Sequence, residues 1–143
     1  GPKAADQTMV TRHLVERVPE HFGSFRPVAA LAALTPGCDT HLVNAARLRI
    51  KESDRLASVT QVLNALGADV EEHADHLVLR GRERLAGGVT VSGHNDHRIA
   101  MMAAIAATRC QGPVTITGAE CVNKSYPRFW ADYEALGGQI ART

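Results

Sequence analysis

Aromatic residues, and an excess of either charge, are scarce in this chain of 143 residues. Phe, Trp and Tyr make up only 4% of it, and 16 Lys and Arg are balanced by 15 Asp and Glu, which gives a formal net charge of +1. Proteins that bind nucleic acids usually need a basic field and aromatic rings that stack on bases. The composition therefore predicts no nucleic-acid partner.

Long apolar runs and paired cysteines are also missing. No run approaches the roughly 20 apolar residues of a membrane span, and no signal peptide is visible, so we expect no membrane association. The three cysteines, Cys38, Cys110 and Cys121, are odd in number and form no CxxC motif. This pattern favours reduced thiols and a cytoplasmic protein. At 45% hydrophobic and 22% charged residues, the chain has the composition of an ordinary globular domain.

Motifs for metals and nucleotides are weak or absent. Two H-x-D-H strings, His73–His76 and His94–His97, could suggest zinc, but one falls in an expected turn and the other across an expected helix start. No H-E-x-x-H string or cysteine pair accompanies them. No Gly-rich loop has the spacing of a nucleotide-binding motif. We therefore expect neither a metal nor a cofactor.

Helix-like and strand-like segments alternate along the chain. We expect helices at 26–35, 52–66, 96–109 and about 127–136, and strands at 39–44, 69–72, 77–80, 89–92, 114–117 and 139–142, with a hairpin turn at 73–76. The clearest helix is 52–66, because four of its apolar residues share one face and Gly67 is placed to end it; these residues are Leu56, Val59, Leu63 and Leu66.

Three of the expected helices begin alike, with Arg26, Arg55 or Arg98 just ahead of an apolar, Ala-containing run. This similarity indicates an internal repeat. Helices of such repeats would pack side by side with their N-termini pointing the same way and with sheet on their outer side. Their first turns would then form a surface suited to an anion.

The string RLRIKESDR, residues 47–55, is the strongest candidate for such a surface. On a helix, Lys51 and Arg55 would share a face because they are four residues apart. Cations held together there are stabilised by a ligand with several negative charges. A solvated helix start held by local ion pairs explains the same residues equally well. Spacing alone leaves both interpretations open.

Two further clusters are candidates. In GHNDHRIAM, residues 93–101, Arg98 could grip a carboxylate with His97 as a neighbouring donor; alternatively, Asn95 or Asp96 is simply a helix cap followed by solvated residues. In ECVNKSYP, residues 120–127, Lys124 lies in an expected loop, where a lone lysine is usually only a solvated charge.

Four strings, in order and at matching separations, resemble the C-terminal part of the EPSP synthase family, the 3-phosphoshikimate 1-carboxyvinyltransferases. They are RLRIKESDRL (47–56), LGADVEE (66–72), NDHRIAM (95–101) and CVNKSYPRF (121–129). The resemblance runs from about residue 24 and covers about the last third of the family's usual length. It implies an α+β enolpyruvyltransferase fold with two βαβαββ-type repeat units, about 23–86 and 87–143. Residues 1–22 would hold a tag scar, Gly1-Pro2, and a poorly matched segment.

The resemblance also implies a reaction, in which the enolpyruvyl group of phosphoenolpyruvate moves to the 5-hydroxyl of shikimate-3-phosphate and phosphate is released. Arg55, Arg98 and Lys124 match residues that hold phosphoenolpyruvate, and Lys51 matches one that contacts the shikimate hydroxyls. Glu52 matches a residue assigned to proton transfer, and His97 belongs to the same side of the site. The implied catalytic residues are Glu52, Lys124 and His97.

The chain also departs from the family. Ser24 stands where the family has a substrate-binding Asp, and the N-terminal domain is missing. We therefore expect no turnover by the chain alone. Three interpretations stay open: a C-terminal fragment of the enzyme, a degenerate or split subunit that needs an N-terminal partner, and a module that binds small phosphorylated anions. A truncated repeat would leave apolar surface exposed, which predicts self-association, most simply as a homodimer.

Overall fold

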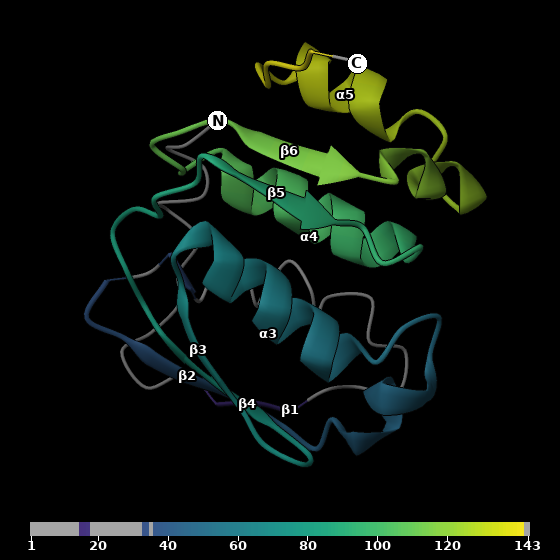
Figure 1. Cartoon of the computed structure of the whole chain (residues 1–143). Helices are drawn as coiled ribbons and strands as arrows, with labels where there is room; N and C mark the ends of the chain where they lie inside the picture. Colours follow the sequence, from purple (N-terminus) through teal and green to yellow (C-terminus); the bar gives the residue numbers. More distant parts are fainter. Residues whose placement is uncertain (1–14, 18–32, 35, 142–143) are drawn as a thin grey trace.

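The computed structural model describes residues 15–17, 33–34 and 36–141 (Figure 1). Its first sheet contains β1 (Val15–Arg17), β2 (Asp39–Val43), β3 (Asp69–Glu72) and β4 (Leu77–Arg80) in the order β1-β2-β4-β3. β1 runs parallel to β2, whereas β4 is antiparallel to both of its neighbours. The predicted β2, β3, β4 and the turn at 73–76 are confirmed; β1 was not predicted.

Helix α3 (Arg55–Leu66) crosses one face of this sheet. It begins at Arg55 because the Asp54 carboxylate accepts a hydrogen bond from the Ala57 amide at 3.2 Å, as an N-cap does. It ends at Gly67, whose φ of +107° closes the helix in the left-handed region. The four apolar residues predicted to share a face are all fully buried. The predicted start at residue 52 is three residues too early, because the cap is Asp54.

The second part of the chain contains β5 (Val89–Ser92), α4 (His97–Ala107), β6 (Val114–Thr117) and α5 (Phe129–Ala135), and β5 pairs with β6 in parallel. These strands are as predicted, and both helices are shorter than predicted. α4 begins at His97 because Asp96 is its N-cap. Two short 3₁₀ helices, η1 (Ala46–Ile50) and η2 (Ala119–Lys124), were not predicted.

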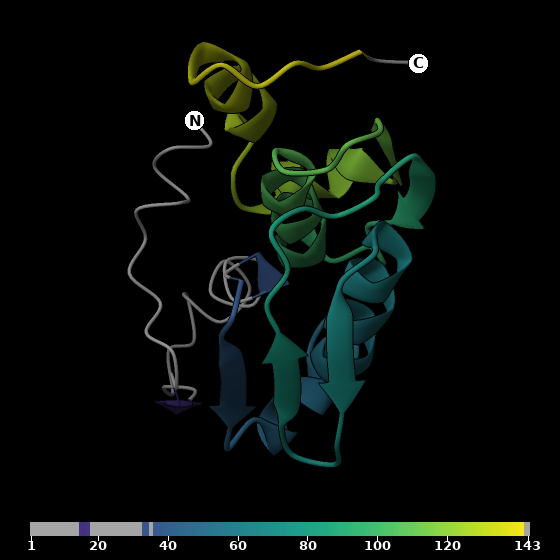
Figure 2. The same ribbon diagram turned by 90° about the vertical axis from the view of Figure 1, so that its left-hand side faces the viewer.

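The two long helices lie side by side between the sheets (Figure 1). The four-stranded sheet covers α3 on one side, and the β5–β6 pair covers α4 on the other; Figure 2 shows the same arrangement from the side. One core of Leu, Val, Ala, Ile and Met side chains joins these layers. The α+β fold class, with packed helices and sheet outside them, is confirmed. Both helices begin at the same end of the molecule, which places their first turns together.

Some predicted elements differ or lie outside the described residues. The helix predicted at 26–35 lies outside them except for Ala33 and Leu34, and so does Ser24. The strand predicted at 139–142 is wrong for 139–141, which form no strand and pair with no strand in the described part of the chain. None of the helices described is long and apolar enough to span a membrane.

Candidate active site at the first turns of α3 and α4

A tight turn between β5 and α4 organises the candidate site. His94 and Asn95 both have positive φ, +55° and +50°, and the Asp96 amide donates to the Gly93 carbonyl at 2.9 Å. Positive φ at both central residues is the signature of a type I′ turn. The Ser92 hydroxyl supports the turn by accepting a hydrogen bond from the His94 amide at 2.9 Å. The turn places Asn95 and Asp96 next to each other at the start of α4.

Asp96 binds the side chain of Arg55 from the neighbouring helix. The Arg55 Nε atom lies 2.8 Å from Asp96 Oδ2, and Nη2 lies 3.4 Å from Oδ1. The Ser53 hydroxyl donates to Oδ2 at 2.9 Å, and the Arg98 amide donates to Oδ1 at 3.1 Å. The Asp96 side chain is fully buried and that of Arg55 is 2% exposed. A carboxylate out of water needs such donors, because burial without them is costly.

These contacts fix the charge state of Asp96. Burial by itself would raise its pKa, but the hydrogen bonds from Arg55 and Ser53 and the charge of Arg55 outweigh it, so the pKa of Asp96 lies below its ordinary value. At neutral pH the carboxylate is therefore ionised and Arg55 stays paired with it. The guanidinium of Arg55 is held in one orientation before any ligand arrives.

Glu52 also contacts Arg55, through an ion pair between Oε2 and Nη2. Its side chain is 48% exposed, so this carboxylate faces solvent. A hydrogen bond from its own backbone N–H is the main cause that lowers the pKa of Glu52. Partial burial acts in the opposite direction, and the charge of Arg55 lowers the pKa further. In the described chain Glu52 is thus a carboxylate at neutral pH.

Lys51 does not share a helical face with Arg55, and that premise of the sequence analysis is wrong. Lys51 lies in extended backbone between η1 and the Asp54 cap, and its side chain is exposed. The arginine is instead neutralised by the carboxylates of Glu52 and Asp96. The local ion pair of Arg55 with Glu52 is present, but Arg55 is buried rather than solvated and its other carboxylate, Asp96, is 41 residues away.

His97 and Arg98 form the first turn of α4. His97 is buried, and its Nδ1 atom has no hydrogen-bond partner in the described part of the chain. Burial, followed by the nearby Arg98 charge, lowers the pKa of His97. The imidazole is therefore neutral at physiological pH. Arg98 is half-buried, and Asp96 is the cap that the alternative interpretation expected.

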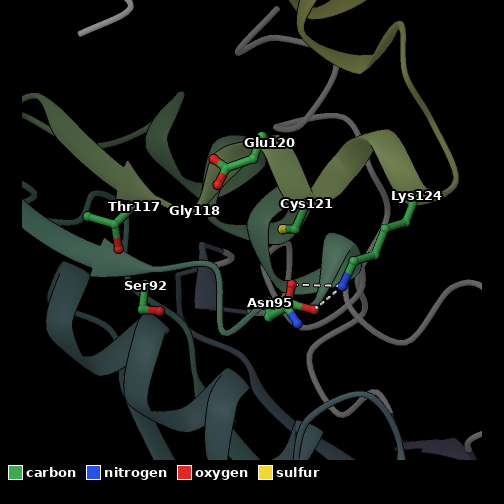
Figure 3. Close-up of a pocket in the computed structure, with 7 residues that line it drawn as sticks. All are labelled: Ser92, Asn95, Thr117, Gly118, Glu120, Cys121 and Lys124. Carbon is green, nitrogen blue, oxygen red and sulfur yellow. Dashed lines mark hydrogen bonds between the residues drawn. The ribbon is translucent and has the colours of Figure 1, made fainter.

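Lys124 lies beside the same turn, at the end of η2 (Figure 3). Its ammonium donates to the backbone oxygen of Asn95 at 2.9 Å and to Oδ1 of the same residue at 2.7 Å. A cavity of about 380 Å³ opens here at the carboxyl ends of β5 and β6. Its lining is formed by Ser92, Asn95, Thr117, Gly118, Glu120, Cys121 and Lys124. Lys124 is thus a held cation rather than a freely solvated one.

The structure brings most of the predicted residues to one end of the helix pair. Glu52, Arg55 and His97 surround Asp96, and Lys124 is bound by the residue next to it. Sequence reasoning missed Ser53 and Asn95 as contacts, and it treated Asp96 only as a possible cap. The available signal was the string of polar residues directly before His97 and Arg98, but a cap was enough to explain it.

The two histidines of the His73–His76 turn contact each other and neighbouring carboxylates. Their imidazoles stack with centroids 4.3 Å apart, and each pairs with a carboxylate, Glu71 or Asp75. Arg49 fastens this turn to α3 by donating to the His73 carbonyl and to Asp54. The described residues hold no group of three or more His, Cys, Asp or Glu side chains suited to a metal ion.

The packed helices with sheet outside them have the fold of the enolpyruvyl transferases. The solved enolpyruvyl transferase NikO from Streptomyces tendae superposes with a TM-score of 0.73 over 94% of this chain and 30% of its own, at 20% identity, which shows the fold alone. EPSP synthase from Acinetobacter baumannii superposes with a TM-score of 0.75 at 35% identity, over 82% of this chain and 27% of its own.

The chain belongs to the EPSP synthase (3-phosphoshikimate 1-carboxyvinyltransferase) family, whose model matches residues 7–133. A 3-phosphoshikimate 1-carboxyvinyltransferase from Clostridium acetobutylicum is 56% identical over 113 residues, and one from Clostridioides difficile is 48% identical over 114. These matches cover 79% and 80% of this chain but 26% of each relative. The chain therefore spans about a quarter of its relatives' length, less than the third expected.

Proposed function

We propose that this chain is the C-terminal part of an EPSP synthase and forms one side of its active site. The proposed reaction transfers the enolpyruvyl group of phosphoenolpyruvate to the 5-hydroxyl of shikimate-3-phosphate and releases phosphate. The observation that carries the proposal is the buried pair of Arg55 and Asp96, which brings the first turns of α3 and α4 together. Each predicted residue on these two turns then lies at the same end of the helix pair.

The cations suit anionic substrates. We assign Arg55, Arg98 and Lys124 to phosphoenolpyruvate and Lys51 to the shikimate hydroxyls. Because Asp96 orients Arg55 beforehand, little reorganisation is needed as charge develops on the leaving phosphate. His97, neutral and buried beside Arg98, can act as a hydrogen-bond donor without adding a charge.

Glu52 is the candidate for proton transfer at C3 of phosphoenolpyruvate. A general acid works best with a pKa near the working pH, whereas the pKa of Glu52 is lowered in this chain. Its exposure accounts for the difference, since cover by further polypeptide would desolvate the carboxylate and raise its pKa. We therefore propose that Glu52 becomes an acid only when the rest of the enzyme closes over it.

The missing part is proposed to be an N-terminal domain, supplied by the same polypeptide or by a separate subunit. The units stay assigned as 23–86 and 87–143, after a first segment of residues 1–22, which the family model matches from residue 7 onward. Ser24 in place of the family Asp favours a degenerate or split subunit among the alternatives. Three cysteines without a CxxC motif, Cys38, Cys110 and Cys121, support a cytoplasmic setting.

The test is reconstitution. The chain is mixed or co-expressed with the Clostridium acetobutylicum relative lacking its matching C-terminal quarter, and phosphate release is measured with both substrates. We expect none from either part alone and release from the pair. Glu52→Gln should reduce that release about 100-fold or more, whereas Glu83→Gln, an exposed matched control, should not. A pair that assembles but releases no phosphate would reject the proposed reaction.

Binding without turnover is a second candidate, favoured by the cavity beside Lys124. Calorimetry of the isolated chain with phosphoenolpyruvate decides it. Heat that saturates and that disappears with Lys124→Met supports an anion-binding module. No heat at millimolar phosphoenolpyruvate rejects it.

A further inference from the structure

We propose that Asn95 is a positioning residue for Lys124, which it holds over the cavity through two neutral oxygens so that the ammonium keeps its charge for an anionic ligand. The identity of that ligand rests on the proposed function, but the positioning does not. Asn95 alone offers two acceptors to this ammonium, at 2.9 and 2.7 Å.

The Lys124 ammonium has more donors than Asn95 has acceptors bound to it. An ammonium has three N–H groups and no acceptor, and Asn95 takes two of them. In the part of the chain that the structure describes, Lys124 has no other acceptor and no ion pair. The third N–H is therefore available to a ligand. In Figure 3 the Lys124 side chain bends down to Asn95, while Glu120 extends from the other end of η2.

The residue that binds the Lys124 ammonium is itself neutral. The turn holds two cations by consecutive residues, but in different ways: Asp96 neutralises Arg55 with a buried carboxylate, whereas Asn95 binds Lys124 with an amide and a carbonyl. A carboxylate at residue 95 would compete with an anionic ligand for the ammonium. A neutral amide restricts the rotamer freedom of the lysine side chain, and it adds no negative charge beside the ammonium.

The backbone of Asn95 has a conformation that few residue types adopt. Asn95 lies at a φ of +50°, a region that Gly, Asn and Asp enter far more readily than other residues. In this conformation both of its oxygens reach the same ammonium. The cavity of about 380 Å³ beside them falls in the size range of small-molecule sites, about 300 to 1,000 Å³. A small phosphorylated anion is the class of ligand that fits the charge and the space.

The backbone requirement supplies a sharp set of variants. Asn95→Gly keeps the turn and the carbonyl but removes Oδ1, and Asn95→Asp keeps the turn but adds a carboxylate. Asn44 is the matched control, because it is an exposed asparagine that also has a positive φ, +60°. Asn44→Gly and Asn44→Asp therefore repeat both changes away from Lys124.

Nitrogen-15 spectra of the lysine ammonium groups provide the first readout, since the chain contains only Lys3, Lys51 and Lys124. We expect Asn95→Gly to speed exchange of the Lys124 ammonium protons several-fold, and both Asn44 variants to leave it unchanged. Exchange that is equally fast in the original chain and in Asn95→Gly would contradict the proposal. This readout needs no enzymatic turnover.

Titration with inorganic phosphate, followed at Lys124, is the second readout. We expect Asn95→Asp to raise the dissociation constant about tenfold or more and Asn95→Gly to raise it two- to fivefold, and both effects to vanish in a Lys124→Met background. The proposal is overturned if phosphate does not shift the Lys124 signal of the original chain, or if the losses persist without Lys124. Failure of reconstituted phosphate release alone rejects the proposed reaction and leaves the positioning of Lys124 intact.

Discussion

Arg55 and Asp96 form an ion pair whose side chains are 2% and 0% exposed, with 2.8 Å between Nε and Oδ2. The pair connects the first residue of α3 to the cap of α4. It therefore both links α3 to α4 and supports the candidate site. Its contribution to the free energy of unfolding can be compared with that of an exposed ion pair.

Asp96→Asn should destabilise the chain by about 3 to 5 kcal/mol, because it leaves the buried Arg55 charge without its carboxylate. Urea denaturation measures the loss as a change in the free energy of unfolding. Asp69→Asn is the control, since Asp69 lies 3.5 Å from Arg80 and both side chains are at least 40% exposed. That change should cost less than about 1 kcal/mol. Equal losses from the two variants would contradict the burial argument.

Acid should weaken the fold through the same carboxylate. Because the pKa of Asp96 is lower in the folded state than its ordinary value of 3.8, its contribution is complete above that value and is lost as pH falls through the folded pKa. The stability difference between the original chain and Asp96→Asn should therefore be constant near neutral pH and shrink below about pH 4. Unfolding curves from pH 6 to pH 2.5, roughly the range over which this carboxylate titrates, test it; a difference that does not change is the contrary result.

Protonation of His97 should make the stability of the fold depend on pH in a second range, closer to neutral pH. The pKa of His97 is lowered below its ordinary 6.5 in the folded state, so the unfolded chain takes up a proton first as pH falls below that value, and stability declines. His97→Gln, which cannot be protonated, should remove this part of the decline between neutral pH and about pH 5. Exposed His41 is the matched control, and His41→Gln should keep the decline.

Substitutions at Gly37 and Gly67 can distinguish the cost of a strained backbone from the cost of a steric clash. Gly37 has a φ of +74° and no atom within 4 Å of the place that an added methyl group would take. At Gly67, with a φ of +107°, the added methyl group would lie 3.0 Å from the Ala86 nitrogen. Gly37→Ala should cost about 1 to 2 kcal/mol from the left-handed backbone alone. Gly67→Ala should cost more, because a fixed backbone atom must also move. Thermal unfolding of both variants measures the difference.

Self-association is expected because large apolar side chains lie open to solvent, Ile50 at 84% and Leu136 at 79% exposure. A homodimer would cover part of this surface. Size-exclusion chromatography with light scattering should show a mass that rises with protein concentration. A monomer at every concentration would contradict the expectation.

Local patterns in the sequence predicted the helices and strands well where one rule governed them. The apolar face of α3 and the cap at Gly67 follow from spacing and from the conformational freedom of glycine, and both are confirmed. The first residue of α3 was misplaced because Glu52 and Asp54 are both acids suited to a helix start, and only the hydrogen bond from the Ala57 amide shows which one is the cap.

Contacts between distant residues were beyond these patterns. The separation of Arg55 and Asp96 by 41 positions leaves no periodic signal, and Asp96 already had a sufficient explanation as a cap. The pairing of Lys124 with Asn95 depends on two consecutive residues with positive φ, and neither His94 nor Asn95 requires that conformation. Family resemblance found Lys124, but the residue that holds it became visible only in three dimensions.

Trp130 is the only tryptophan of the chain, and its indole Nε1 donates to the carbonyl of Ala119, the first residue of η2, at 3.2 Å. Its ring also meets those of Phe129 and Tyr133 edge-on. The same short helix ends at Lys124. The fluorescence of Trp130 should therefore report rearrangements of η2, the segment that ends at Lys124, and no added label is needed.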